Sequence, residues 1–251
     1  MGETPIALPP TDDQPEDSFF DRFLGVFISP GQTFDSIARR PDFIAPLIVA
    51  IGVAVAITET MMAKIGMERI VRKSIEMSSR ASQMSADQMQ QAVHQGATIG
   101  AIIARVAEVV GAPIFLLVLA AVGLFIVNVM FGGGAKFKTC FSVICYANLA
   151  GVIGAVLGLV VIIFGDPEQF NSQNFIPSSI GFFLNQRETP KFLYSLASSF
   201  DVFTIWILIL AAMGLSAASA KKVKTAPIFA TYMGLWVVWA LAKAGLSTLG
   251  G

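Results

Sequence analysis

Long apolar runs alternate with short polar segments along most of this chain. Two of these runs, within residues 112–165, flank a Gly-Gly-Gly turn at 132–134 that is followed by Lys136 and Lys138. Each run has roughly the 20 apolar residues that an α-helix needs to cross about 30 Å of hydrocarbon. The pattern therefore predicts a transmembrane hairpin.

The same criterion predicts five spans in all. Gly111 and Pro113 interrupt the approach to the second span and predict a kink there. The predicted fold class is an all-α membrane protein, a five-transmembrane-helix bundle within residues 42–251. The spans are expected at about 43–62, 109–131, 141–164, 202–220 and 227–246.

The polar segment 63–98 also has helical patterning. Met67, Ile70 and Val71 recur at helical spacing, and Ser85 with Gln88 forms a capping-box sequence. We expect two helices here, outside the spans.

Residues 18–41 predict short amphipathic helices. The aromatic side chains Phe19, Phe20, Phe23 and Phe27 recur at helical spacing, after a weak capping box of Ser18 and Asp21. Ser29-Pro30-Gly31 ends this helix, and a second one leads to Arg39, Arg40 and Pro41. Both are too short to span, so we predict interfacial helices with these phenylalanines and arginines at the membrane surface. The alternative is a helix packed on the cytoplasmic face of the bundle.

Composition supports the membrane class. Of the 251 residues, 55% are hydrophobic and 14% are charged, against about 25% charged in soluble domains. The net charge of zero gives no attraction to nucleic acid. Residues 1–17 are acidic and proline-rich and predict a disordered tail rather than a cleavable signal. Cys140 and Cys145 read as small apolar fillers.

The basic residues predict the orientation. An amino terminus in the cytoplasm puts most basic turn residues on one side, and three of them fall in the four-residue turn 221–224. Segment 63–98, with five basic residues of its own, argues for the opposite orientation, but it is longer and more acidic. We predict a cytoplasmic amino terminus and a carboxyl terminus on the other side. The supporting residues are Arg22, Arg39, Arg40, Lys136, Lys138, Lys221, Lys222 and Lys224.

Two short motifs resemble those of a known family. The sequence SPGQTFDSIA at 29–38, before Pro46, is similar to the segment that precedes the first span of bacterial Yip-domain proteins. The sequence FSVICYANL at 141–149 resembles the Tyr-Ala entry to their third helix. The resemblance covers roughly residues 19–249. It implies a five-helix membrane domain with a cytoplasmic amino terminus, and we expect it in a bacterial inner membrane.

The resemblance does not extend to every activity in the family. Eukaryotic members take part in vesicle traffic and bind Rab-type GTPases, and their longer amino-terminal tail carries an Asp-Leu-Tyr-type motif. This chain has a tail of about 18 residues and lacks that motif, so we do not expect GTPase binding.

Catalytic and metal-binding patterns are missing from the sequence. There is no H-E-x-x-H, Walker loop or G-x-S-x-G motif, and His94 is the single histidine. We therefore expect no enzyme, cofactor or metal site. Ionisable and amide groups within spans are often functional, and they are the remaining candidates; the same groups could instead be water-facing ends, interfacial anchors or hydrogen bonds between helices. The candidate site is Glu108, Asn128, Tyr146, Asn148 and Asp201, with Glu59 and Arg105 nearby.

Two functions remain open at this point. The first is a non-enzymatic protein that organises the membrane or binds other membrane proteins, with the lipid bilayer as its main partner. The second is a small transporter or lipid-handling protein with an intramembrane polar site, for which Asn128 and Asn148 on facing helices would be central.

Overall fold

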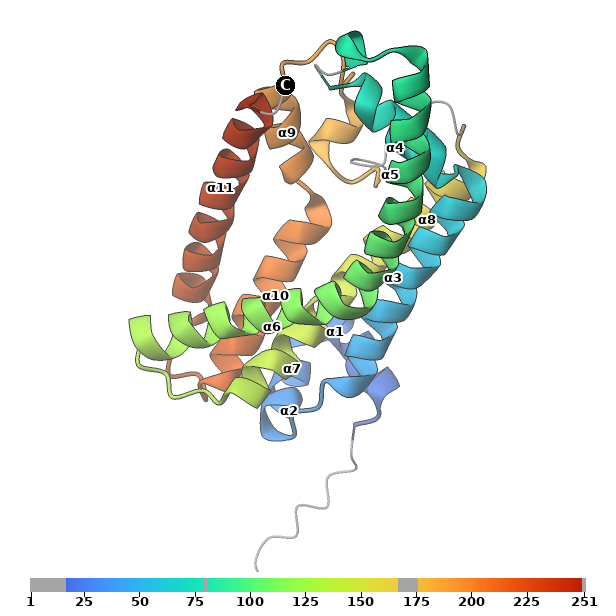
Figure 1. The fold of residues 1–251 in the computed structure, drawn as a ribbon. Coiled ribbons are helices and arrows are strands. Elements are labelled where there is room, and N and C mark those ends of the chain that lie inside the picture. Colours follow the sequence, from blue (N-terminus) through green and yellow to red (C-terminus); the bar gives the residue numbers. More distant parts are fainter. Residues whose placement is uncertain (1–16, 79–80, 167–175, 250–251) are drawn as a thin grey trace, which may run out of the picture.

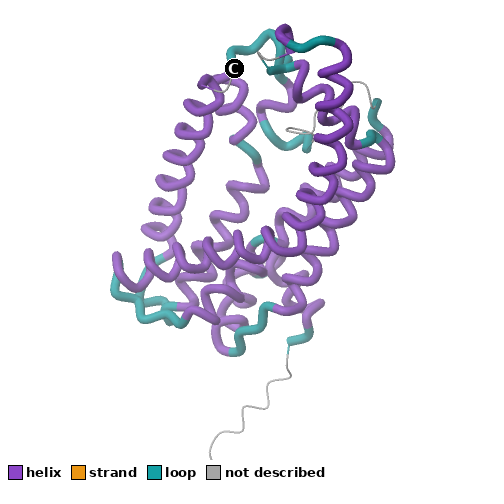
Figure 2. The backbone as a smooth tube through the Cα atoms, viewed as in Figure 1, coloured by secondary structure: helices purple, strands orange, loops and turns teal. Residues whose placement is uncertain are grey.

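The computed structural model describes residues 17–78, 81–166 and 176–249, and the regular elements in these ranges are helices (Figure 2). The predicted disordered tail lies outside the described residues, apart from Asp17. The two free cysteines, Cys140 and Cys145, are both buried, as their interpretation as apolar fillers expects.

The chain begins with a tight helical hairpin. Helix α1 (Phe19–Ile28) starts at a complete Ser18–Asp21 capping box, and Pro30 opens α2 (Pro30–Arg39). The two helices approach closely at Gly25, where a Cβ would lie 2.3 Å from the Thr33 hydroxyl oxygen. Only a residue without a side chain fits there.

Within the described ranges, four helices are long and apolar enough to cross a membrane: Ile44–Lys64 (α3), Ala86–Met130, Phe137–Phe164 and Thr225–Thr248. Helix α10 (Val202–Ala218) is apolar but has 17 residues, which is about 25 Å of helix. The all-helical membrane fold is therefore confirmed, and the count of five spans stays a prediction.

The predicted kink is a change of helix type. Helix α5 (Ala86–Val106) passes through a π-helical turn, η2 (Ala107–Gly111), into α6 (Ala112–Phe125), which ends in a second π-helical turn, η3 (Ile126–Met130). In Figure 1, α5 runs along the bundle and α6 lies across it. The direction changes beside Pro113, which follows the first π-helical turn.

The third span has a break in it. Helix α7 (Phe137–Ala147) gives way to α8 (Leu149–Phe164) at Asn148. Close packing of small residues joins α8 to α10, because a Cβ on Gly154 would lie 2.7 Å from the Phe203 ring. This agrees with small residues serving contacts within the bundle.

Helix α10 lies at the centre of the core, where the residues from Leu210 to Ala212 and Gly214 to Ala217 are buried. It packs against α2, α7, α8 and α11 (Thr225–Leu249). Phe34 of α2 is fully buried and reaches Gly214, where a Cβ would lie 2.7 Å from its ring and 2.4 Å from Val143. The hairpin is thus part of the core.

The connecting segments gather at the two ends of the bundle (Figure 1). One end holds α1, α2 and the loops before α7 and α11. The other end holds α4 (Met67–Glu76), α9 (Lys191–Ser199) and the end of α11, with the short turns η1 (Ala81–Gln83) and η4 (Ile180–Phe183). The basic turns that predicted the cytoplasmic side therefore lie at the same end as the hairpin.

Candidate functional site at the amino-terminal hairpin

A buried arginine holds the hairpin to the first span. Arg22 lies on α1 between Phe19 and Val26, and only 5% of it is exposed. Its Nη1 atom donates to Asp42 Oδ2 and to the Arg40 carbonyl oxygen, each at 3.0 Å. The arginine therefore ties α1 to the segment that joins α2 and α3.

The same carboxylate is shared with the third span. The Tyr146 hydroxyl donates to Asp42 Oδ1 at 2.8 Å, and Tyr146 is fully buried. Asp42 thus bridges a cation on α1 and a phenol on α7. Since the positive charge of Arg22 and the negative charge of Asp42 balance, the junction is neutral. We call these three residues the Arg22–Asp42–Tyr146 junction.

Both family-like motifs contact this junction, because Arg22 Nη2 donates to the Ser36 hydroxyl of the first motif at 3.5 Å and Tyr146 belongs to the second. Thr33 and Phe34 of the first motif also form the contact with α1 and the insertion into the core. The hairpin is also tied to the α10–α11 turn by an ion pair between Lys221 Nζ and Asp35 Oδ2 at 2.7 Å. Elements far apart in sequence therefore fix the position of α1 and α2.

Docking divides the apolar residues of α1 between two faces. Phe19, Phe23 and Phe27 pack against the core, and Phe27 makes an edge contact with Trp206 at 5.5 Å between ring centroids. Phe20 is 73% exposed and begins an outward row with Leu24 at 55% and Ile28 at 78%. We call Phe20, Leu24 and Ile28 the outer stripe. Of the four phenylalanines predicted at the membrane surface, only Phe20 belongs to the outer stripe.

The predicted arginines lie at the end of α2, next to the first span. Arg39 and Arg40 are exposed, and the Arg40 carbonyl accepts the bond from Arg22. At the start of α1, the Ser18 hydroxyl and backbone N–H donate to Asp21 and hold the pKa of that carboxyl below its ordinary value. Asp21 is therefore ionised at neutral pH and suits the positive end of the helix dipole.

The two candidate amides are engaged by backbone groups. Asn128 donates to the Ala135 carbonyl at 2.9 Å and accepts from its N–H at 2.7 Å, which fixes the glycine-rich loop. Asn148 donates to the Ile144 carbonyl one turn earlier, at 2.8 Å. Among the described contacts, the two amides share no hydrogen bond with each other.

The remaining candidates lie elsewhere. Asp201 caps α10 by accepting from the Thr204 N–H at 3.0 Å, and the Ser178 hydroxyl donates to its other oxygen. Glu108 lies in the first π-helical turn, beside Arg105. Of the five candidate residues, the described structure brings only Tyr146 into the junction.

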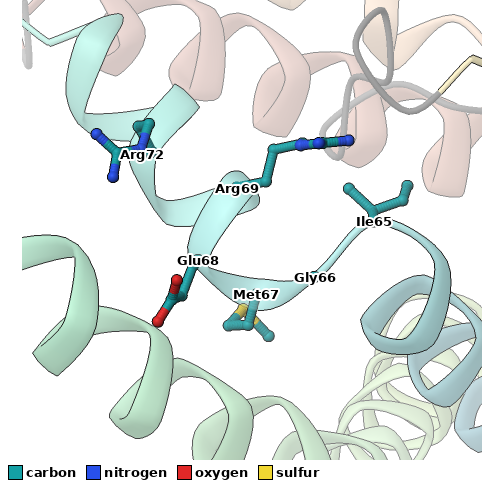
Figure 3. A pocket seen from close by; sticks show the side chains of 6 residues that line it. All are labelled: Ile65, Gly66, Met67, Glu68, Arg69 and Arg72. Atoms are coloured by element: carbon teal, nitrogen blue, oxygen red, sulfur yellow. The ribbon is translucent and has the colours of Figure 1, made fainter.

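A shallow pocket lies at the opposite end, where α4 begins. Ile65, Gly66, Met67, Glu68, Arg69 and Arg72 line it (Figure 3). Figure 3 shows the Arg69 and Arg72 side chains pointing away from one another. The pocket therefore has no convergent set of polar groups that would hold a ligand. Nearby, the exposed His94 lies 3.5 Å from Glu68.

Sequence reasoning missed Arg22 and Asp42 as partners. The signal available was a charged residue between Phe19 and Phe23 on an otherwise apolar face. A charge at such a position is expensive to bury unless it is paired. The position of Arg22 on an apolar face therefore implied an anionic partner. The sequence around Arg22 did not indicate that this partner is Asp42.

Comparison with known proteins identifies the family. The model of the Yip1 domain matches residues 24–246, nearly the whole described chain. This chain belongs to the Yip1 domain family. It is 24% identical over 232 residues to the membrane protein YknW of Bacillus subtilis (strain 168), covering 91% of this chain and 92% of that protein. No solved structure matches significantly.

The Yip1 domain match covers the spans and two members of the junction, Asp42 and Tyr146. It begins within α1, two residues after Arg22, and ends near the end of α11. The predicted Yip-family membership is confirmed, and with it the identification as a multi-pass membrane protein. The match includes the second half of α1 and all of α2, so most of the hairpin lies within the Yip1 domain.

Proposed function

We propose that this protein is a non-enzymatic organiser of its membrane, which uses the amino-terminal hairpin as its contact surface. The observation that carries the proposal is that the two faces of α1 differ. The Arg22–Asp42–Tyr146 junction holds the inner face rigidly, and the outer stripe leaves three large apolar side chains exposed. A fixed helix that presents such a row is suited to contacts with lipid and with neighbouring membrane proteins.

The proposal includes the location of this surface. The hairpin end carries Lys136, Lys138 and the basic turn 221–224, which the positive-inside rule assigns to the cytoplasm. We therefore place α1 at the cytoplasmic surface of a bacterial inner membrane. The relative from Bacillus subtilis, named as a membrane protein, supports a bacterial membrane setting.

A transport site is not proposed. Its central residues were Asn128 and Asn148, and their hydrogen bonds to Ala135 and Ile144 give both side chains an ordinary structural role.

Photo-crosslinking in cells tests the contact surface. A photoreactive amino acid replaces Leu24 of the outer stripe, and in a matched variant it replaces Gln32, which is exposed on α2. We expect Leu24 to give adducts with membrane proteins or with lipid, at several times the yield of Gln32. Protein adducts identify partners by mass spectrometry, and lipid adducts identify the bilayer as the contact. Equal yields at both positions would refute the proposal.

A further inference from the structure

Two carboxyl groups compete for one arginine between α3 and α5. Arg105 donates through Nε and Nη2 to both carboxylate oxygens of Glu59, at 2.6 and 3.0 Å. Glu108 follows Arg105 by three residues on the same helix, a spacing at which side chains can meet. Its Oε2 atom is buried and has no hydrogen-bond partner. Glu59 thus takes both of these Arg105 donors, and the Glu108 carboxyl group is not hydrogen-bonded to the guanidinium.

The surroundings of Glu108 are apolar. Large aliphatic side chains that are 51–61% exposed lie both before and after it along the helix. Ile99 precedes Glu108 by nine residues, about 13 Å of helix, so apolar surface extends well beyond the carboxyl group toward the start of α5. Helix Ala86–Met130, which carries this surface, is long and apolar enough to cross a membrane, so we infer that the surface contacts hydrocarbon. The side chains concerned are Ile99, Ile102, Ile103, Val106, Val109 and Val110.

The local charge balance disfavours ionised Glu108. Glu59 and Arg105 already neutralise one another, and α6 contributes no charged residue. An isolated carboxylate in a medium of low dielectric constant costs so much that the group takes up a proton instead. The π-helical turn holds Glu108 at this position, and such turns occur often at functional sites.

We propose that Glu108 is a proton-binding site, neutral while Glu59 holds Arg105 and ionised when Arg105 turns to it. Ionisation releases one proton to water and leaves Glu59 without its partner. The exchange therefore couples one proton to the tie between α3 and α5. This inference does not depend on the proposed function, because it concerns a different part of the bundle.

Carbodiimide labelling of the full chain in lipid vesicles tests the site. A hydrophobic carbodiimide takes up the proton of a neutral carboxyl group and forms a stable N-acylurea on it. We expect an adduct on Glu108 by peptide mass spectrometry, and its loss in Glu108→Gln. A water-soluble carbodiimide should label Glu68, whose side chain is 66% exposed, at least tenfold more than Glu108.

Two variants test the competition. Glu59→Gln frees Arg105 for Glu108, so labelling of Glu108 by the hydrophobic reagent should fall at least tenfold. Arg105→Gln should have the opposite effect, with Glu108 still labelled and Glu59 newly labelled. The proposal is overturned if Glu108 takes the water-soluble reagent as readily as Glu68, or if Glu59→Gln leaves its labelling unchanged. Should Glu59→Gln not fold, absence of a Glu59 adduct in Arg105→Gln overturns it equally.

Discussion

The position of the hairpin depends on a few individual side chains. Arg22 is a charged residue on the inner face of α1, and its burial is tolerated because Asp42 and the Arg40 carbonyl accept its hydrogen bonds. Tyr146 adds a neutral donor to the same carboxylate. Removing Asp42 leaves Arg22 and Tyr146 buried without that partner, whereas removing the charge of Arg22 leaves a carboxylate whose side chain is 50% exposed. An unpaired buried charge is the more costly of the two.

The first prediction compares two variants of the junction. Asp42→Ala leaves the Arg22 guanidinium buried without its anion and should lower the free energy of unfolding by about 1–3 kcal/mol. Arg22→Met keeps much of the volume and removes the charge, so it should cost less. Chemical unfolding of the purified protein in detergent micelles measures both. An equal loss in the two variants would contradict a stabilising role for the pairing.

The second prediction concerns the insertion of Phe34. Gly214→Ala places a methyl group where the Phe34 ring and Val143 already lie within 2.7 Å of the Cβ position, and overpacking of this kind costs about 1–3 kcal/mol. Gly234→Ala on α11 is the matched control, because nothing lies within 4 Å of its Cβ position. The control should be neutral or stabilising by up to about 1 kcal/mol. The two thermal midpoints should move apart, and a Gly214→Ala midpoint at or above wild type would refute the contact.

At the scale of elements, apolar runs predict the helices and not the faces they bury. The predicted first span at 43–62 corresponds to Ile44–Lys64, and the predicted Ser18 and Ser85 capping boxes are both present. These features are local, so the sequence pattern suffices. The inner and outer faces of α1 could not be separated, because Phe19, which packs against the core, and Phe20, which is exposed, are the same residue type. Nor could the junction be found, since Asp42 lies 20 positions beyond Arg22 and Tyr146 lies 104 positions beyond Asp42.

The third prediction separates the two candidate amides. Asn128→Ala removes both side-chain hydrogen bonds between η3 and the glycine-rich loop and should destabilise the loop by about 1–2 kcal/mol. Hydrogen exchange at 131–136 should then become several times faster. Asn148→Ala removes a single side-chain bond within one helix turn and should leave that loop unchanged. Equal exchange in the two variants would show that Asn128 does not fix the loop.

At the scale of the whole molecule, charge and connectivity describe a two-ended bundle. The hairpin, the loop before α7 and the basic turn 221–224 lie at one end, and α4 and α9 lie at the other (Figure 1). The apolar helices between the two ends are the segments expected to cross the membrane. The basic residues predict which end of the bundle faces the cytoplasm. An experiment in a sealed membrane tests this prediction.

The fourth prediction measures that sidedness. Lys222→Cys in the basic turn and Ser74→Cys on α4 introduce single exposed thiols, while Cys140 and Cys145 are buried and give little background. An impermeant thiol reagent added to intact cells should label Ser74→Cys and not Lys222→Cys. Lysed cells are the control in which both should react. Labelling of both positions, or of Lys222→Cys alone, in intact cells would contradict a cytoplasmic hairpin.

The insertion of Phe34 beside Gly214 has a consequence for biosynthesis. The two residues are 180 positions apart, so a ribosome that adds 5–20 residues per second needs roughly 9 to 36 s between them. Throughout that interval the hairpin is complete in sequence but lacks its receptor surface. A newly made amino terminus must therefore wait at the membrane surface, where an insertion factor or a chaperone can bind the apolar face that the mature fold hides.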